Sequence, residues 1–201
     1  MGYYIFSYAV EPTKLQNMLG CKDADVYKEI MQTETFQLYA EQDFVGSVST
    51  KNALRQLIFG EPYVYSSGHS YWYAFIALTD YVGEKLPSTH DIKLSYETDL
   101  INEYLDADFG IKIVIEEVLI NEQTPFNLPK VADWPLAGLL DKPALKTLLS
   151  QLEGIVISDE LIESFAEEDE EKEMAYDSIR QIQDNVSFCL SNDLAMLSFC
   201  H

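Results

Sequence analysis

The sequence predicts an α+β fold in which a small mixed sheet is covered by several helices. Aromatic and β-branched residues alternate near the N-terminus, a short apolar segment lies near the C-terminus, and most segments between them carry apolar residues at helical spacing. Hydrophobic residues make up 47% and aromatic residues 12% of the 201 residues, a content that suits a single buried core at this chain length. We therefore expect residues 1–201 to form one domain, with two small domains as the alternative. We also expect the two terminal strands to share one sheet.

The start of the chain predicts one strand followed by two helices. Residues 3–10 alternate aromatic and other side chains, as in a strand that is buried on at least one face. Pro12 suits the first turn of a helix, and Gly20 suits its C-terminal end. Asp23 is a typical N-cap and predicts a second helix that continues toward Leu38.

Two further helices are predicted before residue 90. Ser49 or Thr50 caps the first, which Gly60 stops, and a loop follows over residues 61–69. The strongest helical pattern of the chain covers residues 71–86, because its apolar residues recur three and four positions apart.

The second half of the chain is less regular. Ser95 is a candidate cap for another helix, whereas residues 111–120 fit either a strand or a helix. Four prolines predict that residues 124–143 are mostly irregular. A short helix is expected over residues 144–152 and a final strand over residues 194–200.

An acidic helical segment is expected at about residues 158–190. Its apolar stripe is clear at both ends and weak around residues 167–173. The pattern fits one long helix or two shorter ones.

Several pieces of the chain together resemble an uncharacterised family of bacterial proteins of unknown function. They are the aromatic N-terminal strand YYIFSYAV, the helix with YWYAFIAL, the segment DWPLAGLL and the C-terminal strand LAMLSFCH. The resemblance covers most of the chain. It implies a bacterial origin and a globular cytoplasmic domain, and it transfers no catalytic residue.

The charge of the chain is strongly negative and unevenly spread. The sequence holds 34 acidic and 13 basic residues, a net charge of −21. Within residues 159–177, Lys172 is the one basic residue among many acids. Such a balance disfavours binding to nucleic acid or to an anionic membrane, because both recruit Lys and Arg. The aromatic content argues against a disordered acidic chain.

We expect a reducing, cytoplasmic setting. The three cysteines are widely spaced and odd in number, so they do not form a disulfide framework. The N-terminal segment lacks the basic region of a signal peptide, and no apolar run is long enough to span a membrane.

Known catalytic and metal-binding patterns do not occur in the sequence. The histidines and cysteines lack zinc spacing, and neither a G-x-S-x-G elbow nor a glycine-rich phosphate loop is present. Cys21 is the best candidate nucleophile, against a structural thiol as the simpler interpretation. We therefore assign no catalytic residue and expect no cofactor and no metal ion.

Two groups of residues are candidates for binding. A partner-binding surface is predicted at Glu167, Glu168, Asp169, Glu170, Glu171 and Glu173, against a solvated helix face as the alternative. A groove is predicted at Tyr63, Tyr65, His69, Tyr71 and Trp72, against aromatic residues that simply fill the core.

These observations favour a non-enzymatic protein-binding module. A concrete version is an immunity- or antitoxin-like inhibitor of a basic partner, either a toxin or a nucleic-acid-binding protein. The alternative is a hydrolase-like enzyme with a dispersed site near residues 63–73 and carboxylates. A purely structural or regulatory module is the third class.

Overall fold

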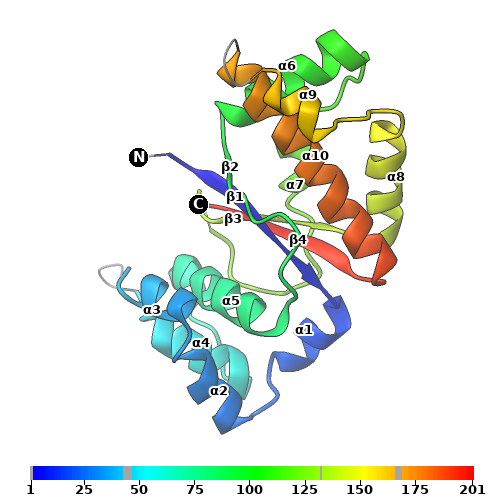
Figure 1. Ribbon diagram of the computed structural model, residues 1–201. Helices are drawn as coiled ribbons and strands as arrows, with labels where there is room; N and C mark the ends of the chain where they lie inside the picture. Colours follow the sequence, from blue (N-terminus) through cyan, green and yellow to red (C-terminus); the bar gives the residue numbers. More distant parts are fainter. Residues whose placement is uncertain (1, 43–46, 132, 166–168) are drawn as a thin grey trace. The chain divides into compact units, whose positions relative to one another are not determined.

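The computed structural model describes residues 2–42, 47–131, 133–165 and 169–201 (Figure 1). The chain divides into two compact units. The first contains Met1–Ala9, Lys85–Gln123 and Ala137–His201, and the second contains Val10–Glu84 and Thr124–Leu136. The elements confirm the α+β class, with the sheet in the first unit and a group of helices in the second.

The sheet of the first unit has the order β2-β1-β4-β3 among the described residues. Its strands are β1 (Tyr4–Val10), β2 (Ile92–Lys93), β3 (Leu136–Leu140) and β4 (Ala195–Cys200). Tyr4 and His201 exchange both backbone hydrogen bonds, at 3.0 and 3.2 Å, which is the pattern of an antiparallel pair. The prediction that the two terminal strands share one sheet is therefore confirmed.

Helices of the first unit pack on this sheet and on one another. They are α6 (Glu97–Phe109), α7 (Ile115–Leu119), α8 (Lys142–Leu152), α9 (Asp159–Glu163) and α10 (Glu170–Ser191). The long helix α10 contacts α6, α8 and β4. Ile179 and Val186 form part of its buried face, and Ile101 and Leu105 are buried on α6.

Three predictions for this unit need correction or completion. The acidic segment forms two helices, because Ser158 caps α9 and Asp169 caps α10. The ambiguous stretch contains the short helix α7. Within residues 124–143, which were predicted to be mostly irregular, residues 136–140 form the strand β3. This strand escaped prediction since its five residues are flanked by prolines at 135 and 143.

The second unit is helical. It contains α1 (Pro12–Met18), α2 (Ala24–Ile30), α3 (Glu34–Ala40), α4 (Thr50–Phe59), the 3₁₀ turn η1 (Tyr65–Ser67) and α5 (Gly68–Val82). The buried helix α5 contacts the four preceding α-helices, and Tyr71, Phe75 and Leu78 on it are inaccessible to solvent.

Local side chains set the boundaries of these helices. Ser49 caps α4 and Gly60 ends it with a positive φ of 65°, as predicted. The helix predicted to run from residue 23 toward residue 38 is instead two helices. Thr33 interrupts it, because its hydroxyl accepts a hydrogen bond from the Phe36 N–H and caps α3.

Candidate functional site

The predicted acidic surface lies at the N-terminal end of α10. Asp169 accepts a hydrogen bond from the Lys172 N–H at 3.0 Å, and Glu170, Glu171 and Glu173 fall in the first turn. Acidic side chains are favourable there because the helix dipole is positive at that end. The other two predicted residues, Glu167 and Glu168, lie outside the described residues. We call Asp169, Glu170, Glu171 and Glu173 the acidic end of α10.

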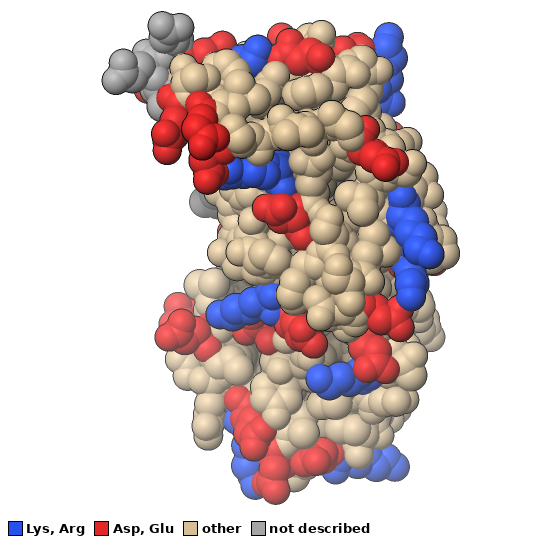
Figure 2. Space-filling view, turned by 45° about the vertical axis from the view of Figure 1, so that its right-hand side comes forward, with Lys and Arg blue, Asp and Glu red and all other residues tan. Residues whose placement is uncertain are grey.

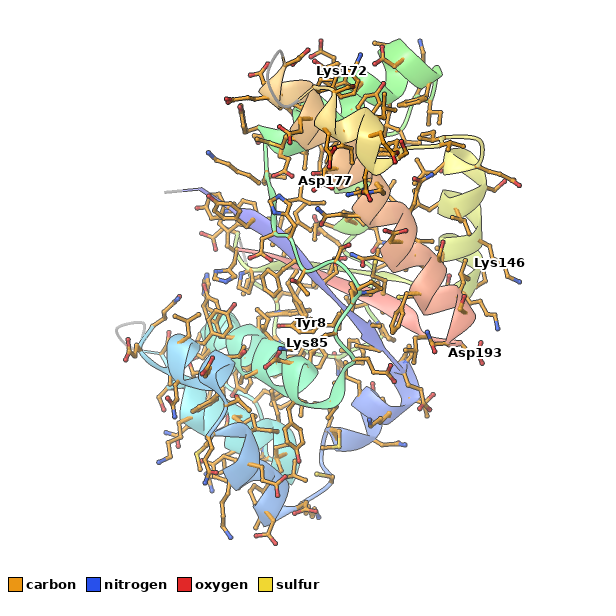
Figure 3. The ribbon with its side chains drawn as sticks, viewed as in Figure 1. Tyr8, Lys85, Lys146, Lys172, Asp177 and Asp193 are labelled. Carbon is orange, nitrogen blue, oxygen red and sulfur yellow. The ribbon has the colours of Figure 1, made fainter. Side chains whose placement is uncertain are left out.

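Lys172, the one base of this run, is enclosed by aromatic rings. Its Nζ lies 5.2 Å from the ring centre of Phe165, 5.3 Å from that of Tyr104 and 5.4 Å from that of Tyr176. It also lies 2.7 Å from a carboxylate oxygen of Asp108 on α6. We call Tyr104, Asp108, Phe165 and Tyr176 the lysine cage. Figure 3 shows Lys172 near the start of α10, with Asp177 further along the same helix.

Hydrogen bonding within the lysine cage shifts the acidity of its members. The Tyr176 hydroxyl donates to Asp108 at 2.7 Å. The hydrogen bonds from Lys172 and Tyr176 lower the pKa of Asp108. Burial, followed by the hydrogen bond to Asp108, raises the pKa of Tyr176 well above its ordinary range. At neutral pH the cage therefore holds a carboxylate and a neutral phenol beside the ammonium group.

Acids from two helices gather beside the cage. The pKa of Tyr104 is raised mainly by burial, and then by the negative charges of Asp169, Glu103 and Glu171. These charges come from α6 and α10, so the acidic end of α10 continues onto α6. Among residues in the described ranges, none forms an ion pair with Glu170, Glu171 or Glu173.

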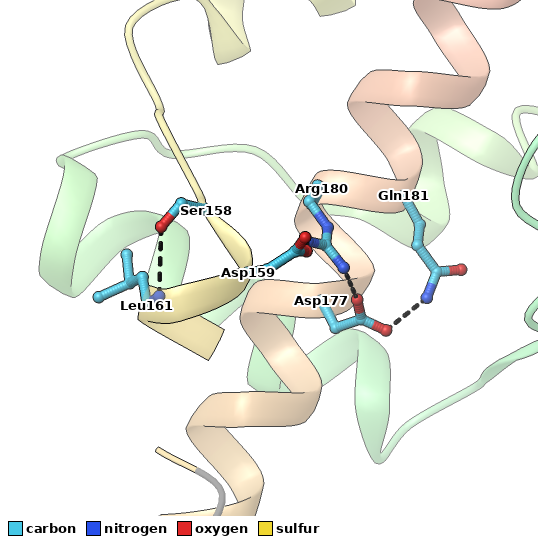
Figure 4. Close-up of polar contacts among 6 residues, drawn as sticks. All are labelled: Ser158, Asp159, Leu161, Asp177, Arg180 and Gln181. Atoms are coloured by element: carbon cyan, nitrogen blue, oxygen red, sulfur yellow. Dashed lines mark hydrogen bonds and ion pairs between the residues drawn. The ribbon is translucent and has the colours of Figure 1, made fainter. Parts of the chain in front are cut away.

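A polar groove of about 510 Å³ lies in the first unit, further along α10. Its lining comes from the loop before β2, from α9 and from α10, and consists of Ser88, Thr89, His90, Asp159, Asp177, Arg180, Gln181 and Asp184. Arg180 bonds to Asp159 and, at 2.7 Å, to Asp177 (Figure 4). Gln181 donates to the other oxygen of Asp177 at 2.6 Å. The guanidinium charge of Arg180 is thus matched by two carboxylates within the protein.

A buried carboxylate lies near this groove. Glu97 is 3% exposed. It accepts hydrogen bonds from Ser178 and from the Lys93 N–H, and its Oε1 is 2.8 Å from His90 Nε2. A serine hydrolase needs its histidine between the serine and the acid. Here the acid lies between the other two, so this trio does not form a catalytic triad.

The residues of the predicted aromatic groove have different surroundings. Tyr71 is fully buried, and its hydroxyl accepts a hydrogen bond from the Val64 N–H at 2.8 Å. Tyr63 packs on Tyr71 with ring centres 5.0 Å apart. Trp72 donates its indole N–H to the Pro129 carbonyl at 3.0 Å, whereas Tyr65 is 71% exposed. The groove stays a prediction.

His69 forms a pair with a carboxylate in the second unit. Its Nε2 lies 2.9 Å from Asp133 Oδ1, and this hydrogen bond is the main reason that the pKa of Asp133 is lowered. A histidine oriented by an acid is one component of nucleophilic sites. Cys21, the candidate nucleophile, is exposed, whereas Cys189 and Cys200 are buried. The enzyme alternative stays a prediction.

The described ranges contain no metal-ligand cluster. No group of three or more His, Cys, Asp or Glu residues in them has an arrangement that could hold a metal ion. Figure 2 shows one face of the molecule, on which acidic side chains are scattered among basic ones and do not form one continuous patch.

Sequence reasoning singled out the acids of α10 and missed the lysine cage. The cage combines residues from α6, from the turn after α9 and from α10, which come together only because α6 packs against α10. One feature of the sequence pointed to part of the cage. Lys172 and Tyr176 are four positions apart and so lie on the same face of a helix.

These features describe an α+β protein with an acidic helix end and a small sheet whose two central strands are the terminal strands of the chain. Residues 1–201 match the family described as a domain of unknown function (DUF7691), so the chain belongs to that family. The predicted resemblance to an uncharacterised family is confirmed. Comparisons with curated proteins and with solved structures found no match. In the part of the chain that the structure describes, no helix has the length and apolar character needed to cross a membrane.

Proposed function

We propose that this protein is a non-enzymatic binding module that captures a basic protein through the acidic end of α10. One observation carries the proposal. The single base of the acidic run is held by Asp108 and three aromatic rings, while no described residue pairs with Glu170, Glu171 or Glu173. The negative charge of these carboxylates is therefore free to attract a cationic partner.

A more specific form of the proposal is an immunity- or antitoxin-like inhibitor in a bacterium. Its partner is then a basic toxin, and a nucleic-acid-binding protein is the other class of basic partner. Acidic side chains of an inhibitor suit both, because they occupy surfaces that otherwise bind phosphate groups. A toxin gene beside the gene for this chain supports this form, and a metabolic operon contradicts it.

Charge reversal tests the binding proposal directly. The triple variant Glu170→Lys, Glu171→Lys and Glu173→Lys is compared with a control that reverses Glu34, Glu41 and Glu84, three exposed acids of the second unit. The two variants have the same net charge. Binding of a short oligolysine peptide is measured by calorimetry at low and at physiological ionic strength, because screening weakens exposed charge pairs.

We expect the α10 variant to lose at least about tenfold in affinity and most of its salt dependence, by loss of three local charges. We expect the control variant to lose much less. Equal losses in the two variants would show that only net charge matters, and the proposal would then be wrong.

A further inference from the structure

The walls of the lysine cage support one another without Lys172. The Tyr176 ring lies 5.2 Å from Phe165 and 6.2 Å from Tyr104, and its hydroxyl holds Asp108. Phe109 packs on the same ring at 5.4 Å. None of these contacts involves the lysine, so the walls of the cage hold one another in place around the ammonium group.

The chemistry of the walls selects a cation. The faces of aromatic rings are negative and attract an ammonium group placed within about 6 Å of their centres. Asp108 adds a full negative charge at 2.7 Å from the Lys172 Nζ. The nearby acids Glu103, Asp169 and Glu171 make the entrance negative as well. A neutral group gains neither the ionic nor the cation–π attraction, and an anionic group is repelled.

Lys172 reaches the lysine cage from a helix position that disfavours its positive charge. It lies in the first turn of α10, where the helix dipole disfavours positive charge. The Lys172 side chain is 24% exposed and that of Asp108 is 30% exposed, so solvent reaches the ion pair. A lysine from outside can therefore approach the same carboxylate.

We propose that the lysine cage is the site where a lysine side chain of the basic partner binds, in exchange for Lys172. This inference rests on the proposed function, because the acidic end of α10 supplies the attraction that brings the partner to the cage. Lys172 then acts as an internal competitor. The apparent affinity of the site is then its intrinsic affinity multiplied by the fraction of molecules in which the cage is open.

The test uses n-butylammonium, which reproduces the end of a lysine side chain, on the full chain. The variant K172A opens the cage, and K172Q keeps most of the stem without the charge. Sodium chloride at equal ionic strength controls for screening, and n-butanol controls for apolar contact. Thermal unfolding is followed by circular dichroism. A peptide with one lysine, and its glutamine counterpart, are then titrated into K172A and into the unmodified protein.

We expect n-butylammonium to raise the unfolding temperature of K172A more than sodium chloride or n-butanol does, and to have less effect on the unmodified protein. The double variant K172A/D108N should lose this response. The lysine peptide should bind K172A at least about tenfold more tightly than the unmodified protein, because the competitor is gone. Should K172A or K172Q unfold, recovery of helical signal on adding n-butylammonium is the expected result.

The inference is overturned if neither variant responds to n-butylammonium beyond the salt control, or if the glutamine peptide binds as well as the lysine peptide. This failure is distinguishable from failure of the proposed function. If the cage accepts no ammonium group but reversal of Glu170, Glu171 and Glu173 abolishes oligolysine binding, the proposed function stands and this inference fails.

Discussion

Ser7 and Ser198 lie 191 positions apart in the sequence, yet their hydroxyl oxygens are 2.8 Å apart. The pair joins β1 to β4, the two central strands of the sheet. It follows the register set by Tyr4 and His201 at one end of the ladder. Both ends of the chain are thus needed to complete the centre of one sheet.

The serine pair should contribute measurably to stability. Ser198 is fully buried, and Ser198→Ala leaves the Ser7 hydroxyl without this partner. We expect a loss of about 1 kcal/mol in the free energy of unfolding, measured with urea. The double variant Ser7→Ala/Ser198→Ala should cost less than the sum of the two single changes, since the second removal finds no bond to break. Strict additivity would contradict a coupled pair.

Some strands and helix boundaries could be predicted from the sequence alone, and others could not. The N-terminal strand was predictable because its alternating aromatic residues leave few alternatives to a strand. Asp23, Ser49 and Gly60 were predictable as helix boundaries, because capping depends on a few adjacent residues. β2 was missed because two residues are too few to show the alternation of a strand. Its position is set by pairing with β1.

Part of the candidate site could be predicted from the sequence, and the lysine cage could not. The acids of α10 are contiguous in sequence, so composition alone identifies them. The cage members Tyr104 and Tyr176 come from helices far apart in sequence, and each is an ordinary aromatic residue of an amphipathic helix. The packing of α6 against α10 brings both rings next to the same ammonium group, that of Lys172.

Gly138 should not tolerate a side chain. A Cβ atom at this position of β3 would lie 2.3 Å from the Leu119 carbonyl oxygen and 2.6 Å from the Asn121 nitrogen. Because both are backbone atoms, the clash cannot be relieved by a rotamer change. We expect Gly138→Ala to lower the free energy of unfolding by about 3 kcal/mol in urea titrations.

A glycine with a different role provides the control. Gly110 has a positive φ of 68°, and a Cβ atom added there would have no neighbouring atom within 4 Å among the described residues. Gly110→Ala should therefore cost only about 1 kcal/mol, from backbone strain alone. A Gly138→Ala variant that is as stable as Gly110→Ala would contradict the close backbone contact in β3.

The three thiols should react at very different rates. Cys21 is exposed, whereas Cys189 and Cys200 are buried. Burial raises the pKa of Cys200 to about 12, and the thiolate is the reactive form. At mildly alkaline pH, iodoacetamide should modify Cys21 first, as seen by mass spectrometry of peptides. Cys21→Ser should remove the fast phase, and the other two thiols should react fully only in denaturant.

Stability should depend on Asp108 in acid. Its folded-state pKa is below the ordinary 3.8, chiefly because of the hydrogen bond from Lys172. The unfolded chain therefore binds the proton first as the pH falls. The stabilisation from Asp108 is fully present above the ordinary pKa of 3.8 and decreases below it toward the folded-state pKa.

Comparison with Asp108→Asn isolates this effect from the other carboxylates. The difference in free energy of unfolding between the unmodified protein and Asp108→Asn should be constant from neutral pH down to mildly acidic pH, and should shrink as the pH falls further. Lys172→Gln should weaken the acid dependence, because it replaces the charged donor of the hydrogen bond that contributes most with a shorter, neutral amide. A difference that stays unchanged across the acid range would contradict an ionised Asp108 beside Lys172. Such a result would mean that Asp108 is not an anion in the folded protein, and the cage would then lack the charge that favours binding of a cation.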